Sequence, residues 1–327
     1  MQTFNYVKAS SVDKALAGAA AGKFIAGGTT LVDLMKLSVE QPPALGDINL
    51  LPLDKVESLP DGGLRIGALA RMSDVAANPD VRSRFPVIAE SLLFAASGQL
   101  RNMATIGGNI MQRSRCTYFR DEDDLPCNKR RPGSGCSARY GINRNHAIFG
   151  RSDDCVATHP SDLAVALAAL DVNVLVRNLG GQRSIPFTEF HRLPGNTPER
   201  DNVLDRGDLI VAIEVPARSE GRASHYFKLR DRQSYEFALV SAAVAVAAER
   251  RRISLVRIAM GGVAHKPWRL TQAEAALRGV SLDDSGALKG AIATSFAEAR
   301  PLAHNAFKIE LAQRVALRAL ETAGVHI

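Results

Sequence analysis

The feature that most constrains this chain is a single cluster of cysteines. All four cysteines among its 327 residues, Cys116, Cys127, Cys136 and Cys155, lie within one stretch of forty residues. Cysteines that only fill a core would be scattered along a chain of this length. We therefore expect the four thiols to share one task, and we expect the rest of the fold to present the segment that carries them.

The spacing of these cysteines leaves three interpretations open. Disulfides are typical of small secreted domains, whereas this chain is long enough to form a large core. Structural zinc sites usually contain cysteine pairs separated by roughly two to four residues. The gaps here are ten, eight and eighteen residues. Wide gaps favour an iron–sulfur cluster that a wrapped loop holds from several sides, with zinc and plain thiols or disulfides as the alternatives.

The cysteine segment also carries most of the positive charge of the chain. Residues 113–151 contain nine lysines and arginines against four acidic residues, a net +5 out of +7 for the whole chain. Cations near an anionic iron–sulfur cluster would favour its reduced form and raise its potential. A solvated basic loop or a nucleic-acid contact is the alternative. The segment has only four aromatic residues and matches no nucleic-acid-binding module, so we expect no nucleic-acid partner.

Three polar motifs flank or precede this segment and could hold a ligand. A predicted strand at 24–26 is followed by Gly27-Gly28-Thr29-Thr30 and a helix, an arrangement that points free backbone N–H groups at an anion. It is neither a P-loop nor the G-x-G-x-x-G fingerprint, so an ordinary turn is the alternative. The second motif is Thr105-Ile106-Gly107-Gly108-Asn109. The third is His159-Pro160-Ser161-Asp162, in which Asp162 is either a helix-dipole carboxylate or an acceptor for a ribose or ribityl hydroxyl.

Apolar periodicity and turn residues divide the chain into three parts and predict an α+β fold. The first part reads as a small β-α-β-α-β unit whose last strand is expected at 47–51. After a polar boundary near 217–223, the last part reads as a separate domain with a three-stranded antiparallel sheet followed by helices. The predicted domains are 1–55, 56–217 with the cysteine insertion at 110–158, and 223–327.

Several functional classes are disfavoured by the composition. The longest apolar run, residues 237–248, is too short to span a bilayer. The first six residues have neither the basic nor the apolar region of a signal peptide, so we expect the chain to stay in the cytoplasm or to reach the periplasm folded, with a signal-bearing partner. No Ser-His-Asp set or acid/base pair is evident, and we expect no catalytic residue.

The three motifs together resemble one family. Ala26-Gly27-Gly28-Thr29-Thr30-Leu31, then Arg101-Asn102-x-x-Thr105-Ile106-Gly107-Gly108-Asn109, and then Ser161-Asp162-Leu163 resemble the FAD-binding medium subunit of the xanthine dehydrogenase family of molybdenum hydroxylases. The resemblance extends to Phe227-Lys228-Leu229-Arg230 and to His304-Asn305-Ala306-Phe307-Lys308, and so covers essentially the whole chain. It implies a PCMH-type FAD-binding fold, with a small βαβ subdomain and a larger α/β subdomain, followed by the C-terminal domain.

Most members of that family have no cysteines in this region. The cysteine segment is most similar to that of the FAD subunits of bacterial periplasmic-type aldehyde oxidoreductases, through runs such as Cys127-Asn128-Lys129-Arg130 and Pro132-Gly133-Ser134-Gly135-Cys136. This likeness implies that Cys116, Cys127, Cys136 and Cys155 hold a 4Fe–4S cluster. The medium subunit of 4-hydroxybenzoyl-CoA reductase also carries a cluster and is the runner-up, because its cysteine spacing resembles this chain less well.

The resemblance also implies which residues bind FAD. The first glycine turn would hold the pyrophosphate, and the second motif would contact the pyrophosphate or the flavin side of the cofactor. Asp162 would accept a hydrogen bond from a hydroxyl, and Lys228 would lie near the flavin ring. The implied FAD residues are Ala26, Gly27, Gly28, Thr29, Thr30, Leu31, Thr105, Gly108, Asn109, Asp162 and Lys228.

The function implied by the resemblance is electron transfer within a heterotrimer. A large subunit with a molybdenum cofactor would oxidise an aldehyde, and electrons would pass through the 2Fe–2S centres of a small subunit to the FAD here and then to an external acceptor. The additional cluster would either relay electrons or pin a loop that is too rich in glycine, proline and charge to pack by itself. The alternative from another class is a zinc-stabilised binding protein without a redox role.

Overall fold

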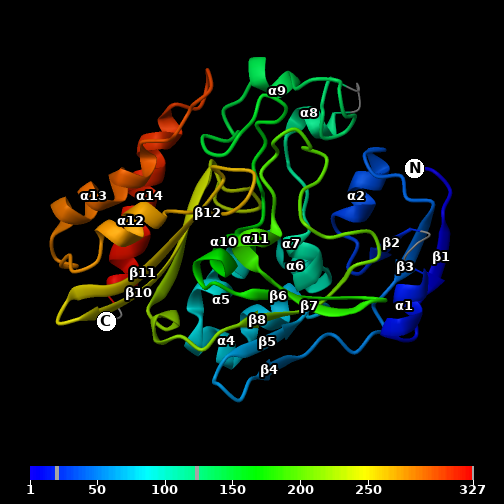
Figure 1. Ribbon diagram of the computed structural model, residues 1–327, viewed down its shortest axis with the longest axis horizontal. Helices are drawn as coiled ribbons and strands as arrows, with labels where there is room; N and C mark the ends of the chain where they lie inside the picture. Colours follow the sequence, from blue (N-terminus) through cyan, green and yellow to red (C-terminus); the bar gives the residue numbers. More distant parts are fainter. Residues whose placement is uncertain (19–21, 122–124, 326–327) are drawn as a thin grey trace.

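The computed structural model describes residues 1–18, 22–121 and 125–325 and has the α+β organisation that the sequence predicts (Figure 1). The strands form sheets of three, five and four strands. The three-stranded sheet stands at one end of the molecule, the five-stranded sheet runs along its base, and the four-stranded sheet with its helices forms the other end. The cysteine segment covers the middle, on the side opposite the five-stranded sheet.

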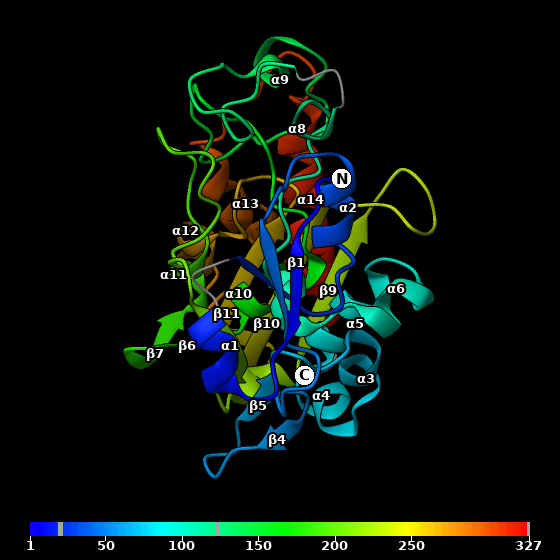
Figure 2. The same cartoon turned by 90° about the vertical axis from the view of Figure 1, so that its right-hand side faces the viewer.

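The N-terminal unit is the predicted β-α-β-α-β arrangement. Its elements are β1 (Asn5–Lys8), α1 (Val12–Gly18), β2 (Lys23–Ile25), α2 (Leu31–Lys36) and β3 (Ala44–Asp47). The strands are parallel, in the order β1-β3-β2. Figure 2 shows this unit from its outer side, with β1 towards the viewer. The expected strand at 47–51 is wrong in position. The chain turns after Asp47 so that Ile48 and Leu51 enter a small apolar core instead of continuing the sheet.

The second unit is built on a sheet whose strand pairings are all antiparallel. Its strands lie in the order β4-β5-β8-β6-β7. They are β4 (Val56–Ser58), β5 (Leu64–Gly67), β6 (Asn173–Asn178), β7 (Gly181–Pro186) and β8 (Leu209–Val215). Its helices are α3 (Met72–Ala77), α4 (Pro79–Arg84), α5 (Pro86–Phe94), α6 (Gly98–Met103), α7 (Ile106–Ile110), α10 (Asp162–Ala169) and α11 (Phe187–Phe190). Each residue of α10 is buried, so this helix forms the centre of the largest core.

The cysteine segment contains only two short helices, α8 (Thr117–Arg120) and α9 (Ser137–Tyr140). The remainder of its described residues form turns and loops above the second unit. Helix α8 lies beside α2 of the N-terminal unit, because Phe119 packs on Leu34 in one apolar cluster.

The C-terminal part contains a sheet in the order β12-β11-β10-β9. Its elements are η2 (Ser219–Gly221), β9 (Ser224–Leu229), β10 (Val240–Glu249), β11 (Arg252–Gly261), β12 (Trp268–Arg269), α12 (Thr271–Ala276), α13 (Ser285–Ala293), η3 (Thr294–Phe296) and α14 (Phe307–Gly324). The three long antiparallel strands were predicted, whereas the two-residue β12 was not.

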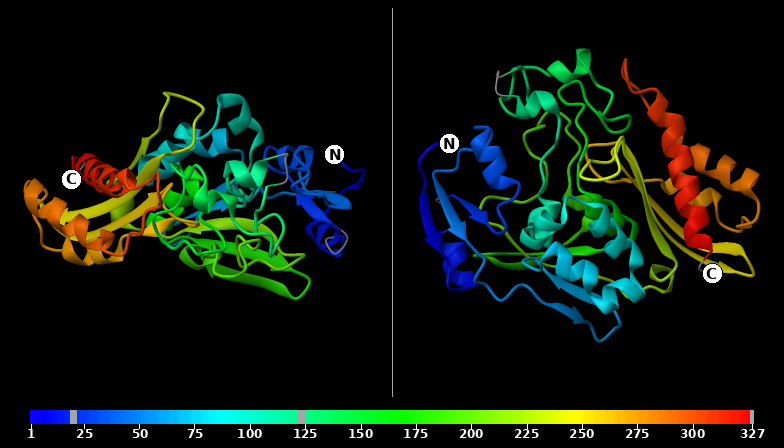
Figure 3. Two further views of the ribbon diagram at one scale, coloured as in Figure 1. Left: turned by 90° about the horizontal axis from the view of Figure 1, so that it is seen from above. Right: turned by 180° about the vertical axis from the view of Figure 1, so that it is seen from behind.

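Both faces of this C-terminal sheet are covered. Ala243 and Ala245 of β10 face the core that contains α5 and α10, while Ala242 and Val244 face the core that contains α14. This alternation follows the two-residue period of a strand. Figure 3 shows α14 lying along the outer face of the sheet. No helix in the described part of the chain combines the length and the apolar sequence needed to cross a membrane.

Candidate functional site

A large cavity lies where the N-terminal unit, the second unit and the hairpin loop between β9 and β10 meet. It has a volume of about 1060 Å³, slightly above the range of roughly 300–1,000 Å³ for ligand pockets. The residues that the sequence suggested for FAD all line this one cavity. They are Ala26, Gly27, Gly28, Thr29, Thr30, Leu31, Thr105, Gly108, Asn109, Asp162 and Lys228.

The first glycine turn forms one wall of the cavity and connects β2 to α2. Gly28 has a φ of +70°, which favours glycine. A Cβ at Gly27 would lie 2.0 Å from the carbonyl oxygen of Met103, so this position excludes any side chain. The backbone N–H groups of residues 28–31 donate to no acceptor among the described residues. This turn is therefore suited to an anionic group such as a pyrophosphate.

The second glycine pair lies in the short helix α7 rather than in a loop. Thr105 caps this helix, since its Oγ1 accepts a hydrogen bond from the N–H of Gly108 at 3.3 Å. The side-chain amide of Asn109 donates to the sulfur of Met72 at 3.3 Å and accepts a hydrogen bond from Ser161. These side chains are thus engaged within the protein. This segment therefore lines the cavity mainly with its backbone and not with bulky side chains.

Two residues that sequence reasoning missed connect the two glycine segments. Asn49 donates to the carbonyl oxygen of Ala26 at 3.0 Å. The guanidinium of Arg71 donates to the side-chain oxygen of Asn49 at 3.2 Å and to the carbonyl oxygen of Met103. These contacts fix the distance between the two walls of the cavity. Neither residue stands in a motif, so the sequence contained no signal for this role.

Asp162 and Lys228 meet at the floor of the cavity as a buried pair. The Lys228 ammonium donates to Asp162 Oδ2 at 2.8 Å and to the carbonyl oxygen of Phe94 at 3.1 Å. Tyr226, which the sequence did not single out, donates its hydroxyl to Asp162 Oδ1 at 2.5 Å. Burial raises the pKa of Asp162, and Lys228 and Tyr226 oppose this by stabilising the carboxylate. Asp162 and Lys228, which were both predicted to contact FAD, thus form an ion pair with each other in this structure.

The cysteine segment folds its four thiols into one region without a disulfide. Cys116 and Cys127 lie in the apolar cluster around Leu34, and residues Cys127 and Cys136 pair as an isolated antiparallel bridge. Burial, together with charge on neighbouring cysteines, raises the pKa of Cys116 to about 12 and that of Cys155 to about 11. The thiols therefore interact electrostatically, and their deprotonation requires a compensating cation.

Backbone N–H groups point at several of these sulfurs. Cys116 and Cys136 stand immediately before the short helices α8 and α9. The N–H groups of Tyr118 and Phe119 donate to Cys116, and that of Ala157 donates to Cys155. Hydrogen bonds to sulfur are a feature of iron–sulfur sites. Four unbridged thiols with such donors, of which Cys127 and Cys155 are buried and Cys116 and Cys136 are half-buried, fit a cluster of this kind.

A single metal ion fits less well. Among residues 1–18, 22–121 and 125–325, no three His, Cys, Asp or Glu side chains converge closely enough to hold one ion. Zinc draws four ligands to one atom, whereas a cluster of four irons keeps its thiolates farther apart. The described residues therefore contain no preformed zinc site, and the same finding identifies no cluster site among them either.

The cavity and the cysteine region adjoin each other through helix α2. Leu34 lines the cavity and also packs with Phe119 and Cys127. Arg115, the residue before Cys116, donates to the hydroxyl of Thr30 in the first glycine turn at 3.4 Å. The same guanidinium lies 4.9 Å from the ring centroid of Phe237 in the β9–β10 loop. One leucine and one arginine thus touch both regions.

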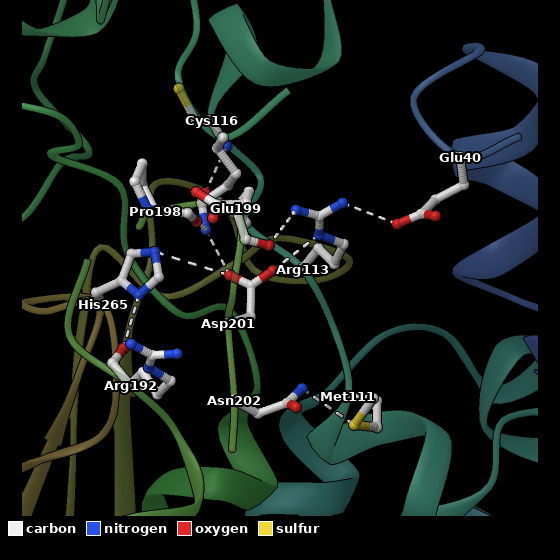
Figure 4. A network of polar contacts seen from close by, with 12 residues as sticks. Glu40, Met111, Arg113, Cys116, Arg192, Pro198, Glu199, Asp201, Asn202 and His265 are labelled. Atoms are coloured by element: carbon white, nitrogen blue, oxygen red, sulfur yellow. Dashed lines mark hydrogen bonds and ion pairs between the residues drawn. The ribbon is translucent and has the colours of Figure 1, made fainter. Parts of the chain in front are cut away.

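A network of ion pairs further joins the two regions (Figure 4). Arg113 binds Glu40 from the N-terminal unit and Asp201 from the loop before β8, each at 2.8 Å. The buried Lys129 donates to the other oxygen of Asp201 at 2.5 Å. Burial alone would raise the pKa of Asp201, but Lys129 and Arg113 hold it well below its usual range. Part of the basic charge of the cysteine segment is therefore neutralised internally.

Two family profiles match the chain and together cover most of it. The profile described as the FAD binding domain in molybdopterin dehydrogenase matches residues 2–218. The profile described as the CO dehydrogenase flavoprotein C-terminal domain matches residues 225–323.

Individual proteins are similar over nearly the same length. The aldehyde oxidoreductase FAD-binding subunit PaoB of Escherichia coli strain K12 is 47% identical over 318 residues, which are 96% of each chain. The glyceraldehyde dehydrogenase medium chain of Sulfolobus acidocaldarius is 28% identical, over 86% of this chain and 83% of its own. Among solved structures, the carbon monoxide dehydrogenase of Hydrogenophaga pseudoflava has a chain with a TM-score of 0.76 and 26% identity, covering 99% of this chain and 98% of its own.

Proposed function

The chain belongs to the FAD-binding medium subunits of the molybdenum hydroxylase family, and from this we propose that it carries electrons out of a multi-subunit aldehyde oxidoreductase. The 47% identity to an aldehyde oxidoreductase subunit favours this class over a 4-hydroxybenzoyl-CoA reductase. In the proposed heterotrimer a large subunit with the molybdenum cofactor oxidises the aldehyde. A small 2Fe–2S subunit delivers the electrons to this chain, and an external acceptor removes them.

FAD is proposed to occupy the large cavity. It supplies storage for two electrons and can release them singly or in pairs. The N–H groups of residues 28–31 are proposed to bind its pyrophosphate, since they have no acceptor among the described residues. Backbone at Thr105, Gly108 and Asn109 would face the cofactor. The Asp162–Lys228 pair would lie beneath it, where the carboxylate can still accept a hydrogen bond from a ribityl or ribose hydroxyl.

A 4Fe–4S cluster is proposed on Cys116, Cys127, Cys136 and Cys155, where it supplies a site for one-electron transfer. The observation that supports its redox role most strongly is Leu34, whose side chain lines the cavity and packs against Cys127. The same contact supports a second role, because a cluster would also order the cysteine segment against α2. The two roles are separable by experiment.

The first experiment is an anaerobic co-purification with partner subunits, followed by iron, zinc, sulfide and flavin analysis. The expected result is one FAD and four iron atoms in this chain in addition to the iron of the partner. Flavin without this additional iron would refute the cluster while leaving FAD binding intact. Zinc in place of iron would support the zinc alternative.

The second experiment replaces Cys127 by Ser, with Thr117→Ala as a control at an exposed residue of the same segment. If the cluster relays electrons, the variant assembles and keeps FAD but reduces the external acceptor slowly. If the cluster is structural, assembly is lost and the rate per assembled complex is normal.

Fractionation of cells that express all subunits would test the further proposal that the chain reaches the periplasm with a signal-bearing partner, as against staying in the cytoplasm.

A further inference from the structure

One buried histidine touches the cysteine site directly. The Nε2 atom of His146 lies 3.2 Å from the sulfur of Cys116. The residue is only 6% exposed, and its ring also lies against Tyr118, with 6.4 Å between ring centroids. In the part of the chain that the structure describes, its Nδ1 is buried and has no hydrogen-bond partner. The contact with sulfur is thus the one close hydrogen-bond contact of this imidazole among the described residues, although the backbone of Asn143 also acts on the ring and raises its pKa against the larger effect of burial.

The position of the ring hydrogen follows from these surroundings. A neutral imidazole carries its hydrogen on one nitrogen. A hydrogen on Nδ1 would be a buried donor without a well-placed acceptor, since the nearby backbone of Asn143 forms no regular hydrogen bond with this atom, and it would leave the Nε2 lone pair facing an anionic thiolate. A hydrogen on Nε2 instead gives an N–H···S bond and leaves only an unpaired acceptor, which is the less costly arrangement. His146 is therefore arranged as a donor to Cys116.

The C-terminal part of the chain holds this histidine in place. Asn305 and Lys308, at the start of α14, both donate to the carbonyl oxygen of His146, at 3.0 and 3.2 Å. Asn143, which is fully buried, accepts a hydrogen bond from the backbone N–H of His304 at 3.0 Å. The His304–Lys308 motif thus acts on the cysteine segment, although it lies about 160 residues further along the chain.

We propose that His146 is a positioning residue of the cysteine site, whose Nε2–H donates to the Cys116 thiolate and thereby favours the reduced form of the bound cluster. A hydrogen bond to a ligand sulfur disperses the negative charge that reduction adds, and so raises the reduction potential. This inference rests on the cluster proposed above. It assigns to Cys116 a side-chain donor in addition to the backbone donors of α8.

The test is a redox titration of the purified complex, followed by the EPR signal of the cluster, in three variants. His146→Met removes the donor, whereas His146→Gln keeps an N–H close to the position of Nε2. His191→Met is the matched control, because His191 is equally buried and bonds to the carbonyl oxygen of Ile110. We expect the ratio of reduced to oxidised cluster, at a fixed solution potential, to fall about tenfold to a hundredfold in His146→Met, as for the loss of one hydrogen bond to a charged group. The ratio should be near that of the wild type in His146→Gln and His191→Met.

Each outcome has a definite meaning. An unchanged ratio in His146→Met overturns the inference. If His146→Met loses its iron, the His146→Gln variant distinguishes the two explanations. If His146→Gln retains its iron and has the wild-type ratio of reduced to oxidised cluster, the N–H···S bond is supported. If His146→Gln loses its iron as well, the ring acts only by packing. Absence of the additional iron in the wild type would contradict the proposed cluster itself, which iron analysis distinguishes before any variant is titrated.

Discussion

Gly27 can carry no side chain, because a Cβ there would lie 2.0 Å from the carbonyl oxygen of Met103. The close approach brings the two glycine segments together, and Arg71 and Asn49 secure it with hydrogen bonds. The cavity depends at this point on a missing atom rather than on a functional group. The sequence readily predicts that such a glycine lies in a turn. It does not reveal which backbone segment packs against that glycine.

We predict that Gly27→Ala weakens FAD binding about tenfold or more, because overpacking of this size costs about 1–3 kcal/mol and moves one wall of the cavity. The measurement is the flavin content per chain, with a thermal unfolding curve to establish that the fold is retained. Gly98→Ala is the control, since a Cβ there meets nothing within 4 Å. Equal flavin content in the two variants would contradict the proposed role of the first glycine turn.

At the scale of single elements, helix α14 begins with an unusual residue. Lys308 lies in its first turn, where the helix dipole disfavours a cation, and its side chain is fully buried. It forms no ion pair with a carboxylate of the described residues, and it donates to the carbonyl oxygens of His146 and Gly262. Burial lowers the pKa of Lys308 to about 7, and the nearby Arg144 contributes to the shift. The lysine therefore joins α14 to the cysteine segment at a cost in stability.

The buried lysine makes the free energy of unfolding depend on pH. The unfolded chain binds a proton at Lys308 up to a pH near 10, whereas the folded chain releases it near pH 7. Between these values the unfolded state binds more protons, so the free energy of unfolding rises with pH. We predict that Lys308→Met makes this free energy less dependent on pH between 7 and 10. Denaturant unfolding at several pH values measures this, and identical slopes in the wild type and the variant would contradict it. Lys289→Met, at an exposed position of α13, serves as the control.

On the scale of the whole molecule, the parts of the chain are held together by shared cores and by one ion-pair network. Helix α10 packs on the C-terminal sheet, so the largest core contains residues from both sides of the predicted boundary near 217–223. Above it, Arg113 and Asp201 connect the N-terminal unit, the cysteine segment and the loop before β8. His265, from the loop after β11, lies 3.7 Å from the same carboxylate.

We predict that Asp201→Asn lowers the free energy of unfolding by about 3–5 kcal/mol, because it leaves Lys129 buried without its carboxylate. Since the pKa of Asp201 is lowered, its contribution is present above the unfolded value of about 4 and is lost only in stronger acid. The effect should therefore be constant from pH 5 to 8. Asp153→Asn is the control, because its carboxylate is 80% exposed and such pairs contribute about 0–1 kcal/mol. Equal stability of the two variants in denaturant unfolding would refute the prediction.

Features that depend on neighbouring residues could be predicted from the sequence alone. The glycine turn between β2 and α2 and the three long C-terminal strands follow from local turn and alternation patterns, and the structure has them as predicted. The resemblance in the motifs likewise gave the family and the set of residues around one cavity. Local patterns failed where packing overrode them, as at Ile48 and Leu51, which enter a core instead of extending a strand.

Only the tertiary structure decided which side chains meet across long separations. Asp162 is 66 residues from Lys228, Arg113 is 88 residues from Asp201, and His146 is 162 residues from Lys308. Each of these contacts depends on how whole elements dock, and a polar side chain takes whichever partner the docking buries beside it. For the same physical reason the sequence could mark Thr105 and Asn109 as cavity residues, yet could not reveal that their polar atoms are engaged by Gly108, Met72 and Ser161.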